Sequence, residues 1–300
     1  MLTSEALDCY RKAGRIVSKV RRLVPQIVKE GMHVLDLCER VEGAINDLGG
    51  KPAFPCNVGI NEVAAHYTSP PNDSSVIPSG AVVKIDFGAE VEGYIADSAI
   101  TISFTPEYEP MTLAAEEALK SAIEGLRPRI RVSEIGALIH KTIVERGYKP
   151  ISNLTGHKVD RYIIHTGKAI PNVPSINGSR IETGEVYAIE PFVTSQSAAG
   201  SVRDLDKAFI YRAHREKGVR TEEAKKLLAY IKRNHRTLPF STRWLRKASP
   251  IQRLDDVFLE LLSSKCVIAY PVLVEATGKP VAQAEHTVAI IEDGCEVLTV

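Results

Sequence analysis

VVKIDFGAEVEGYIADSAI (residues 82–100) reads as two largely apolar strands joined by a turn around Val91–Glu92. Asp86 and Asp97 lie at equal distances from that turn. A regular hairpin would place them opposite each other on one face, with Cβ atoms ~5 Å apart. Two facing carboxylates repel unless a proton or a cation lies between them. Lys84 shares the face by alternation and either neutralises one carboxylate or extends its amine to water.

Other acidic residues and a histidine occupy similarly apolar surroundings. Glu190 ends the apolar run 186–190, Glu285 lies within the run 281–291, and His157 follows Gly156 at the edge of a loop. A charge in such a run is costly without a ligand. Two Asp, two Glu and one His form an oxygen-rich set that suits Mn, Co or Fe and argues against a cysteine-type zinc site.

The chain also contains an internal repeat. Residues 34–52 and 132–150 share five identical positions, and each segment reads as an amphipathic helix that ends at Gly, with Pro beyond it. Each follows another amphipathic helix, and the match continues from 79–88 to 183–192. It pairs residues of similar chemistry: Asp86 with Glu190, and His66 with His165. We therefore expect two helix–helix–strand units related by a pseudo-twofold axis that brings these residues together.

The composition is that of an ordinary globular protein. The 300 residues are 44% hydrophobic and 25% charged, and no apolar run is long enough to cross a membrane. The N-terminus lacks the apolar core of a secretory signal. Five scattered cysteines indicate reduced thiols. We expect a cytoplasmic monomer with no membrane partner.

Positive charge is concentrated in one segment. Residues 203–253 hold 15 Lys/Arg and 5 Asp/Glu, a net charge of +10, and the other residues together carry −9. A helix is predicted to begin at Thr221. The segment is either a solvated charged lobe or a docking surface for nucleic acid or the ribosome. The histidines His33, His140, His214 and His235 are expected at the surface.

Six segments carry a resemblance to a known family. They are FPCNVGINEVAAHYT (54–68), VVKIDFG (82–88), DSAIT (97–101), NLTGHKVDRYIIHTGK (153–168), YAIEPF (187–192) and AQAEHT (282–287). Together they resemble methionine aminopeptidases, which belong to the pita-bread peptidases with prolidase and aminopeptidase P. The resemblance covers nearly the whole chain and is closest to type 2 members of archaeal length, without an N-terminal extension.

The resemblance implies an α+β pita-bread fold with internal duplication and an inserted helical subdomain. The catalytic domain would comprise residues 1–194 and 267–300, with half-repeats at about 1–105 and 106–194. Residues 195–266 would form the basic insertion.

The resemblance also implies the site. The metal ligands would be Asp86, Asp97, His157, Glu190 and Glu285. They would hold two divalent ions (Co, Mn, Fe or Zn), bridged by Asp97 and Glu285, that activate a water as hydroxide. The catalytic residues would be His66, His165 and Glu190, with Glu190 as general base and then acid. The substrate would contact Phe54, His66, His165 and Tyr270.

The implied activity is removal of the N-terminal methionine from nascent polypeptides when the second residue is Gly, Ala, Ser, Thr, Cys, Pro or Val. Two alternatives remain: an X-Pro exopeptidase of the same fold, and a nucleic-acid- or ribosome-binding relative without activity. Such non-enzymatic relatives lose metal ligands, whereas all five are present here. Cys56 departs from the family pattern and is expected to be a buried thiol without a role.

Overall fold

The computed structural model describes residues 2–176, 178–248 and 253–300. Its helices are α1 (Ser4–Ile27), α2 (Val34–Asp47), the 3-10 helix η1 (Pro106–Tyr108), α3 (Glu109–Gly125), α4 (Val132–Glu145), α5 (Glu222–His235), α6 (Thr242–Ala248) and α7 (Leu254–Ser263). Its strands are β1 (Lys51–Pro52), β2 (Asn57–Ile60), β3 (Val63–Ala65), β4 (Val82–Val91), β5 (Tyr94–Ser103), β6 (Tyr148–Pro150), β7 (Thr155–Val159), β8 (Ala169–Pro171), β9 (Val186–Ile189), β10 (Phe192–Ser195), β11 (Val202–Ala213), β12 (Phe240–Ser241), β13 (Val267–Glu275), β14 (Val281–Gln283), β15 (His286–Ile291) and β16 (Gly294–Val297).

The predicted hairpin is present as β4 and β5, but its turn lies one residue later than expected. Val91 pairs with Tyr94, so the turn residues are Glu92 and Gly93, with φ of 52° and 87°. Positive φ at both central positions defines the turn that matches strand twist, and Gly adopts it without steric cost. The turn therefore centres on Glu92–Gly93.

This shift changes how the two aspartates face each other. Asp86 pairs with Ala99, and Asp97 pairs with Gly88. The two carboxylates therefore lie on one face as diagonal neighbours, and the prediction that they are directly opposed was wrong. The Cα atoms of diagonal partners on two neighbouring strands are ~7–8 Å apart, which leaves more space between the carboxylates than direct pairing would.

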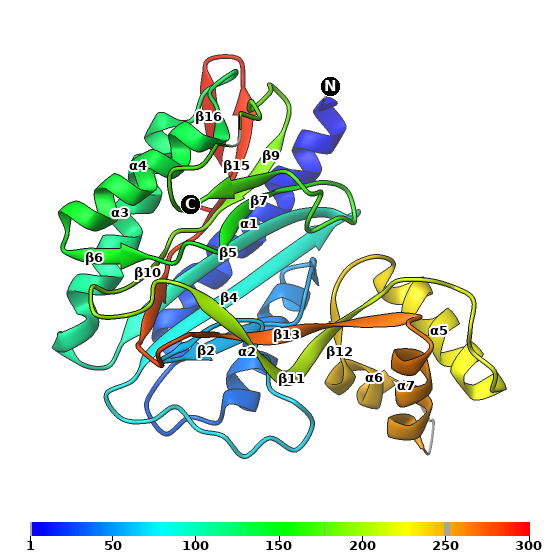
Figure 1. Cartoon of the computed structure of the whole chain (residues 1–300). Helices are drawn as coiled ribbons and strands as arrows, with labels where there is room; N and C mark the ends of the chain where they lie inside the picture. The colour runs from blue at the N-terminus through cyan, green and yellow to red at the C-terminus, as the bar shows by residue number, and fades with distance from the viewer. Residues whose placement is uncertain (1, 177, 249–252) are drawn as a thin grey trace.

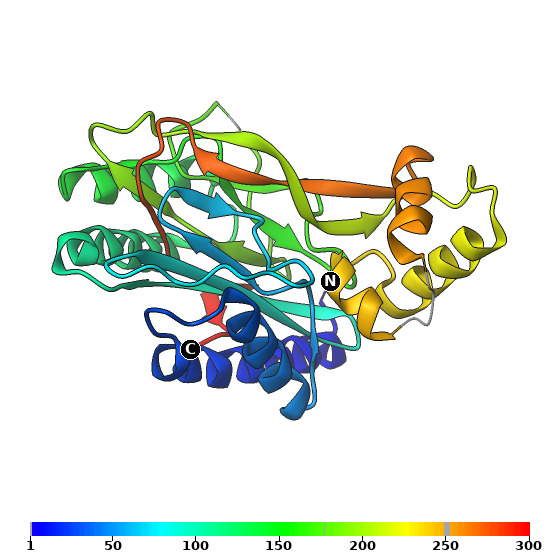
Figure 2. The same ribbon diagram turned by 90° about the horizontal axis from the view of Figure 1, so that it is seen from below.

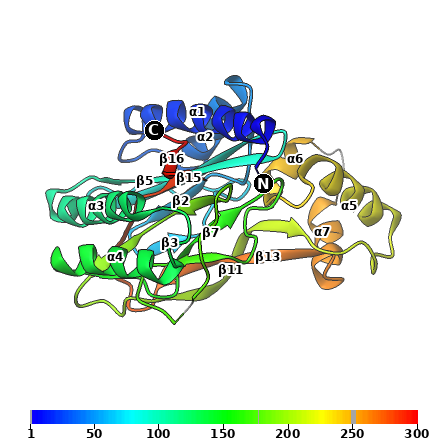
Figure 3. The same cartoon turned by 90° about the horizontal axis from the view of Figure 1, so that it is seen from above.

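Two helix pairs cover the sheets on opposite sides of the molecule. Helices α1 and α2 pack on the β4–β5 hairpin, and α3 and α4 pack on strands that include β9, β10 and β14. Figures 2 and 3 show the two pairs on different faces, with the strands between them. Both α2 and α4 are followed by a left-handed glycine, Gly49 and Gly147. These shared features are what an internal duplication would produce.

The strands form four sheets. One joins β5, β4, β2 and β1; a second has the order β14-β10-β6; a third has the order β12-β11-β13-β3; and the fourth has the order β16-β15-β9-β7-β8. Where partners pair, they are antiparallel, so the mixture of helices and antiparallel sheets agrees with the expected α+β class.

The basic segment lies to one side of the molecule. The long strands β11 and β13 extend from the centre to helices α5, α6 and α7 (Figure 1). These helices enclose a small apolar core of their own. Thr221 caps α5 through a bond from the Ala224 amide to Oγ1 (3.2 Å), as the sequence predicted. His235 is not a solvated residue as expected: its ring stacks on Phe240 and Trp244, and burial lowers its pKa to about 4.

Lys84 takes neither of the two predicted positions. Its Nζ is buried and donates to the carbonyls of Asn61 (2.8 Å) and Val281 (2.7 Å). The amine therefore ties the hairpin to the loop at Asn61 and to β14.

Two further expectations concern the whole chain. In the described part of the chain, no helix is long and apolar enough to cross a membrane. All five cysteines lie within described residues and are free thiols.

Two helical glycines provide a test of the packing. A Cβ at Gly14 of α1 would lie 2.1 Å from the Leu298 carbonyl oxygen, whereas a Cβ at Gly43 of α2 would meet nothing within 4 Å. Gly43→Ala should stabilise the protein by ~0.5–1 kcal/mol because alanine favours helix. Gly14→Ala should destabilise it by ~1–3 kcal/mol because backbone must move. Urea denaturation midpoints measure both, and equal shifts would contradict the described packing of α1 on the C-terminal segment.

Candidate active site

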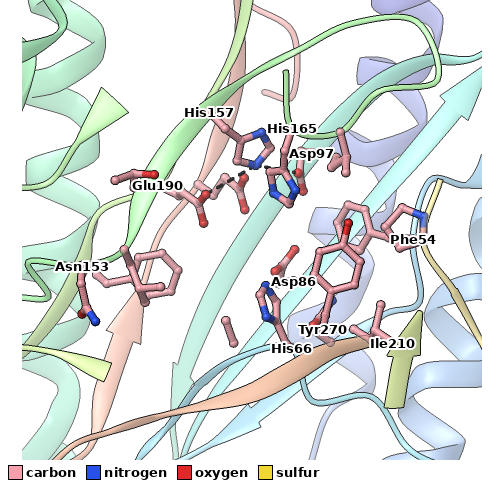
Figure 4. A pocket seen from close by; sticks show the side chains of 18 residues that line it. Phe54, His66, Asp86, Asp97, Asn153, His157, His165, Glu190, Ile210 and Tyr270 are labelled. Carbon is pink, nitrogen blue, oxygen red and sulfur yellow. Dashed lines mark ion pairs between the residues drawn. The ribbon is translucent and has the colours of Figure 1, made fainter. Parts of the chain in front are cut away.

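A cavity of about 220 Å³ lies at the meeting point of the two helix-covered halves and the β11–β13 ribbon (Figure 4). Every residue that the sequence analysis selected for the site lines this cavity: Phe54, His66, Asp86, Asp97, His157, His165, Glu190, Tyr270 and Glu285. They come from segments more than 200 residues apart, so the fold assembles the site from the whole chain.

The acidic residues and His157 form the polar end of the cavity. Candidate ligand atoms of Asp97, His157 and Glu285 lie within 4.8 Å of one another. His157 Nε2 is 3.7 Å from Asp97 Oδ2 and 3.5 Å from Glu190 Oε1. Asp86 lines the cavity from the neighbouring position on β4. Figure 4 shows the side chains of Asp86, Asp97, His157 and Glu190 pointing toward a common space.

Several oxygens of these buried carboxylates lack a hydrogen-bond donor. Asp97 and Glu285 are 3% and 1% exposed, and the oxygens Asp97 Oδ1, Glu285 Oε2 and Asp86 Oδ1 are buried without a hydrogen-bond partner. Burial and the neighbouring negative charges raise the pKa of Asp97, Glu190 and Glu285 well above its ordinary value, and burial raises that of Asp86 to about 7. Buried carboxylates without donors are the arrangement that a divalent cation balances.

Hydroxyl groups join β5 to β14 and β15, the strands on either side of Glu285. Thr287 Oγ1 accepts from the Asp97 amide (2.7 Å) and donates to the Asp97 carbonyl (2.8 Å). Thr101 Oγ1 makes the equivalent pair of bonds with the backbone of Gln283, at 2.8 and 2.7 Å. Between these pairs, the Glu285 amide donates to the Ala99 carbonyl at 3.0 Å. Asp97 on β5 is therefore held next to Glu285, which lies in the short connection between β14 and β15.

Glu190 is oriented by a residue that the sequence analysis did not select. Gln283, which is 1% exposed, donates from Nε2 to Glu190 Oε2 at 3.1 Å. The other oxygen, Oε1, faces His157. The two oxygens of Glu190 are thus in different environments. Gln283 lies in the quoted segment AQAEHT, and its alternation with Glu285 was the available signal.

His66 and His165, the two histidines that the internal repeat pairs, line the cavity together with Tyr270. The His66 and Tyr270 rings meet edge to face at 5.5 Å, and His165 packs against the His157 ring at 4.4 Å. His66 has φ of 65°, a left-handed conformation that is uncommon for a residue with a side chain and is often found at functional sites. Its Nδ1 lies 3.1 Å from the Pro271 carbonyl, which only accepts, so Nδ1 carries the proton. Nε2 is then an acceptor while the ring is neutral, and burial lowers the pKa of both histidines, to about 4 for His165.

One wall of the cavity is apolar, and part of it was missed, as were the polar lining residues Asn57, Asn153 and Thr155. Ile210 and Pro239 belong to the segment that was predicted as a basic lobe, yet they face the cavity with Phe54 and Tyr270. Ile164 and Phe192 complete this wall. No local pattern marks Ile210 or Pro239, because their role depends on where the segment folds back. The segment therefore contributes to the site as well as to the surface.

The chain is similar to known proteins in both sequence and fold. The model of metallopeptidase family M24 matches residues 8–226. A methionine aminopeptidase of Methanothermobacter thermautotrophicus is 45% identical over 296 residues, which cover 98% of each chain. Among solved structures, a thermophilic Arx1 superposes with a TM-score of 0.85 at 19% identity over 99% of this chain and 91% of its own. A methionine aminopeptidase of Thermotoga maritima gives 0.72 at 23% over 99% and 97%. The fold is therefore the pita-bread fold.

The crowded buried carboxylates predict that removing one of them stabilises the metal-free protein. Glu285→Gln should raise the melting temperature of protein stripped with a chelator, by an amount equivalent to ~0.5–2 kcal/mol, because it removes one of several like charges. Differential scanning calorimetry in excess chelator measures this. Glu275→Gln is the matched control, since Glu275 is equally buried but accepts from Gly200, Thr277 and Lys279, and it should lower the melting temperature. A lower melting temperature for both variants would contradict the electrostatic description.

Proposed function

The chain belongs to metallopeptidase family M24, and we infer that it is a metal-dependent aminopeptidase that removes the N-terminal methionine from peptides. The observation that carries this function is the set of nine selected residues around one cavity, in a chain 45% identical to a methionine aminopeptidase over 98% of both sequences. The X-Pro alternative is not favoured, because the relative that is 45% identical over 98% of both chains is a methionine aminopeptidase. The non-enzymatic alternative is not favoured either, because the residues expected as ligands converge.

We propose that the acidic group holds two divalent ions from among Co, Mn, Fe and Zn. The donor set fits: it is rich in oxygen, contains one histidine, and includes buried carboxylate oxygens without partners. Asp86, Asp97, His157, Glu190 and Glu285 would hold the ions. Metal bound there supplies a Lewis acid for the scissile carbonyl and lowers the pKa of water.

Glu190 is the proposed proton carrier. Gln283 occupies its Oε2, so Oε1 is the oxygen that exchanges protons within the cavity. Glu190 would accept a proton from water through Oε1 and return it to the leaving amine.

The two histidines are proposed to hold the scissile peptide unit. His66 is neutral with Nδ1–H bonded to Pro271, so its Nε2 accepts a hydrogen bond from a peptide N–H. His165 would donate to the carbonyl oxygen, where negative charge develops as the bond breaks. The α-amine of the substrate would lie at the acidic end.

The apolar wall is proposed to receive the methionine side chain. Phe54, Tyr270, Ile210 and Pro239 enclose a space smaller than the ~300–1,000 Å³ of sites for drug-sized ligands, which suits one unbranched, polarizable side chain. The second residue would then pass between His66 and His165. A large side chain there would displace the carbonyl, and a shift of ~1 Å is enough to cost ~10²-fold in rate.

A peptide panel tests the function. Met-Ala-Ser and Met-Gly-Ser peptides should be cleaved in the presence of Mn or Co, while Met-Leu-Ser and Met-Lys-Ser should be cleaved at least ~10²-fold more slowly. Acetylation of the N-terminus should block cleavage, and exhaustive chelation should abolish it until metal is restored. Rapid hydrolysis of X-Pro bonds whatever the first residue, or undiminished turnover in verified metal-free protein, would overturn the proposal.

Glu190→Gln tests the proton carrier. It should lower kcat ~10²–10⁴-fold at saturating metal, with a much smaller change in KM, because the amide neither accepts nor returns the proton. Metal content is measured in the same samples, so that loss of metal is recognised. A kcat within a few-fold of wild type would remove Glu190 from this role.

The surface of the insertion offers a proposed partner site. We propose that residues 195–266 form an inserted subdomain whose exposed basic residues contact ribosomal RNA during cytoplasmic synthesis. The net charge of +10 over residues 203–253 supports this. Within this stretch Lys226 and Arg233 are exposed, and Lys225 and Lys232 pair with Glu222 and Glu216.

Neutralisation of this surface gives the test. A variant with Lys225, Lys226, Lys232 and Arg233 changed to Gln should cleave small peptides normally. It should bind ribosomes more weakly and with a flatter salt dependence, because fewer counterions are released. The control changes Lys120 and Lys141, on α3 and α4, to Gln and should leave binding unchanged. Equal salt-dependent binding by all three proteins would contradict the proposal.

A further inference from the structure

A buried ion pair joins the core to the insertion outside the acidic group. Glu42 on α2 and Arg243 on α6 are 6% and 3% exposed. Arg243 Nη1 lies 2.6 Å from Glu42 Oε2, and Nη2 lies 2.8 Å from Oε1, so the pair is bidentate. Trp244, the only tryptophan in the chain, donates from Nε1 to Glu42 Oε2 at 2.8 Å.

The same two side chains hold the core segments that line the cavity. The Cys56 amide donates to Glu42 Oε1 at 3.1 Å, and Arg243 Nε donates to the Ser69 carbonyl at 3.1 Å. Thr68 Oγ1 donates to the Cys56 carbonyl at 2.7 Å and accepts from Arg243 Nη2 at 3.3 Å. These bonds secure two backbone segments, 54–57 and 66–69. Phe54, Asn57 and His66 project from those segments into the cavity.

The ion pair also secures the contribution of the insertion to the wall. Trp244 stacks on His235 at 5.6 Å, and His235 stacks on Phe240 at 5.3 Å. Pro239, directly before Phe240, lines the cavity. On the other side of Pro239, a cleft of about 440 Å³ lies between α2 and α5. Glu42 and Trp244 both line this cleft, so the ion pair joins the core to the insertion along its edge. Leu238, directly before Pro239, belongs to an apolar cluster that includes Phe54 of the core, and the two contacts together hold Pro239 in position.

We propose that Glu42 and Arg243 are positioning residues for the methionine pocket: one buried ion pair sets both core walls and the insertion wall at once. The proposal rests on the proposed function and deepens it, because it assigns side-chain recognition to a contact that touches neither substrate nor metal. A bidentate guanidinium fixes direction as well as distance, which suits a contact that must align three segments.

The test compares variants that break the pair with one that replaces it. Glu42→Gln retains the shape and removes the charge. The double variant Glu42→Leu with Arg243→Met removes both charges and leaves neither one buried alone, which protects the fold. Glu275→Gln is the control, because it alters a buried carboxylate with several donors that lies outside the cavity wall.

For each holoenzyme, kcat and KM are measured with Met-Ala-Ser and Leu-Ala-Ser, together with Mn content and the emission maximum of Trp244. In Glu42→Gln and in the double variant, KM for Met-Ala-Ser should rise at least ~10-fold and the preference for Met over Leu should fall, with kcat within ~3-fold and Mn content unchanged. This is the loss expected when a hydrophobic pocket no longer fits its side chain. Trp244 emission should shift as its bond to Glu42 is lost, and the control should match wild type in all of these.

A folded double variant with shifted Trp244 emission but unchanged KM and preference would overturn the proposal. So would an equal rise in KM for Glu275→Gln, since the effect would then follow from general destabilisation. If the wild-type protein releases no methionine, the proposed function fails. If the wild-type protein is active and the variants behave like it, only the positioning role fails.

Discussion

The seam between β5 and the strands β14 and β15 is the contact on which the rest of the molecule depends. Thr287 and Thr101 bridge the two backbones with their hydroxyls, and Ser98 Oγ donates to the Glu285 carbonyl at 2.8 Å. The seam joins residues about 190 positions apart and brings Asp97 and Glu285 into one buried space. Each hydroxyl both accepts and donates, so the backbone groups at the seam are satisfied while the carboxylates remain free.

The free carboxylates are costly in the metal-free chain, and the surrounding packing offsets that cost. Helices α1 and α2 cover one side of the seam, and α3 and α4 cover the other, each over an apolar core. Such cores maintain an arrangement of like charges that would otherwise open to water. The insertion closes the remaining side, where it is anchored at Glu42 and supplies Ile210 and Pro239 to the cavity. A polar end and an apolar end therefore share one small space.

Local patterns in the sequence were sufficient for much of this arrangement. The hairpin, the helix start at Thr221 and the convergence of Asp86 with Glu190 follow from alternation, capping and the internal repeat. The pairing of the aspartates did not follow, because one residue of shift in a turn changes every partner, and the left-handed Gly93 decided that shift.

Long-range contacts account for what could not be predicted. His235 lies in a strongly basic segment, yet it stacks on two aromatic rings that fold against it. Lys84 bonds to two carbonyls, one of which belongs to a strand nearly 200 residues later. Pro239 faces the cavity because the insertion docks on the core, through the Arg243–Glu42 pair and through Leu238. Composition and periodicity describe a residue's own neighbourhood, and these partners lie outside it.

Equilibrium binding of Mn²⁺ to the chelator-stripped protein, monitored by the electron paramagnetic resonance of free Mn²⁺, tests directly whether the buried carboxylates form a metal site. Binding should saturate at about two ions per chain, as in two-metal hydrolytic sites, with loss of the tighter site in Asp97→Asn and no change in Glu275→Gln. Absence of saturable binding, or binding that Asp97→Asn leaves intact, would contradict it.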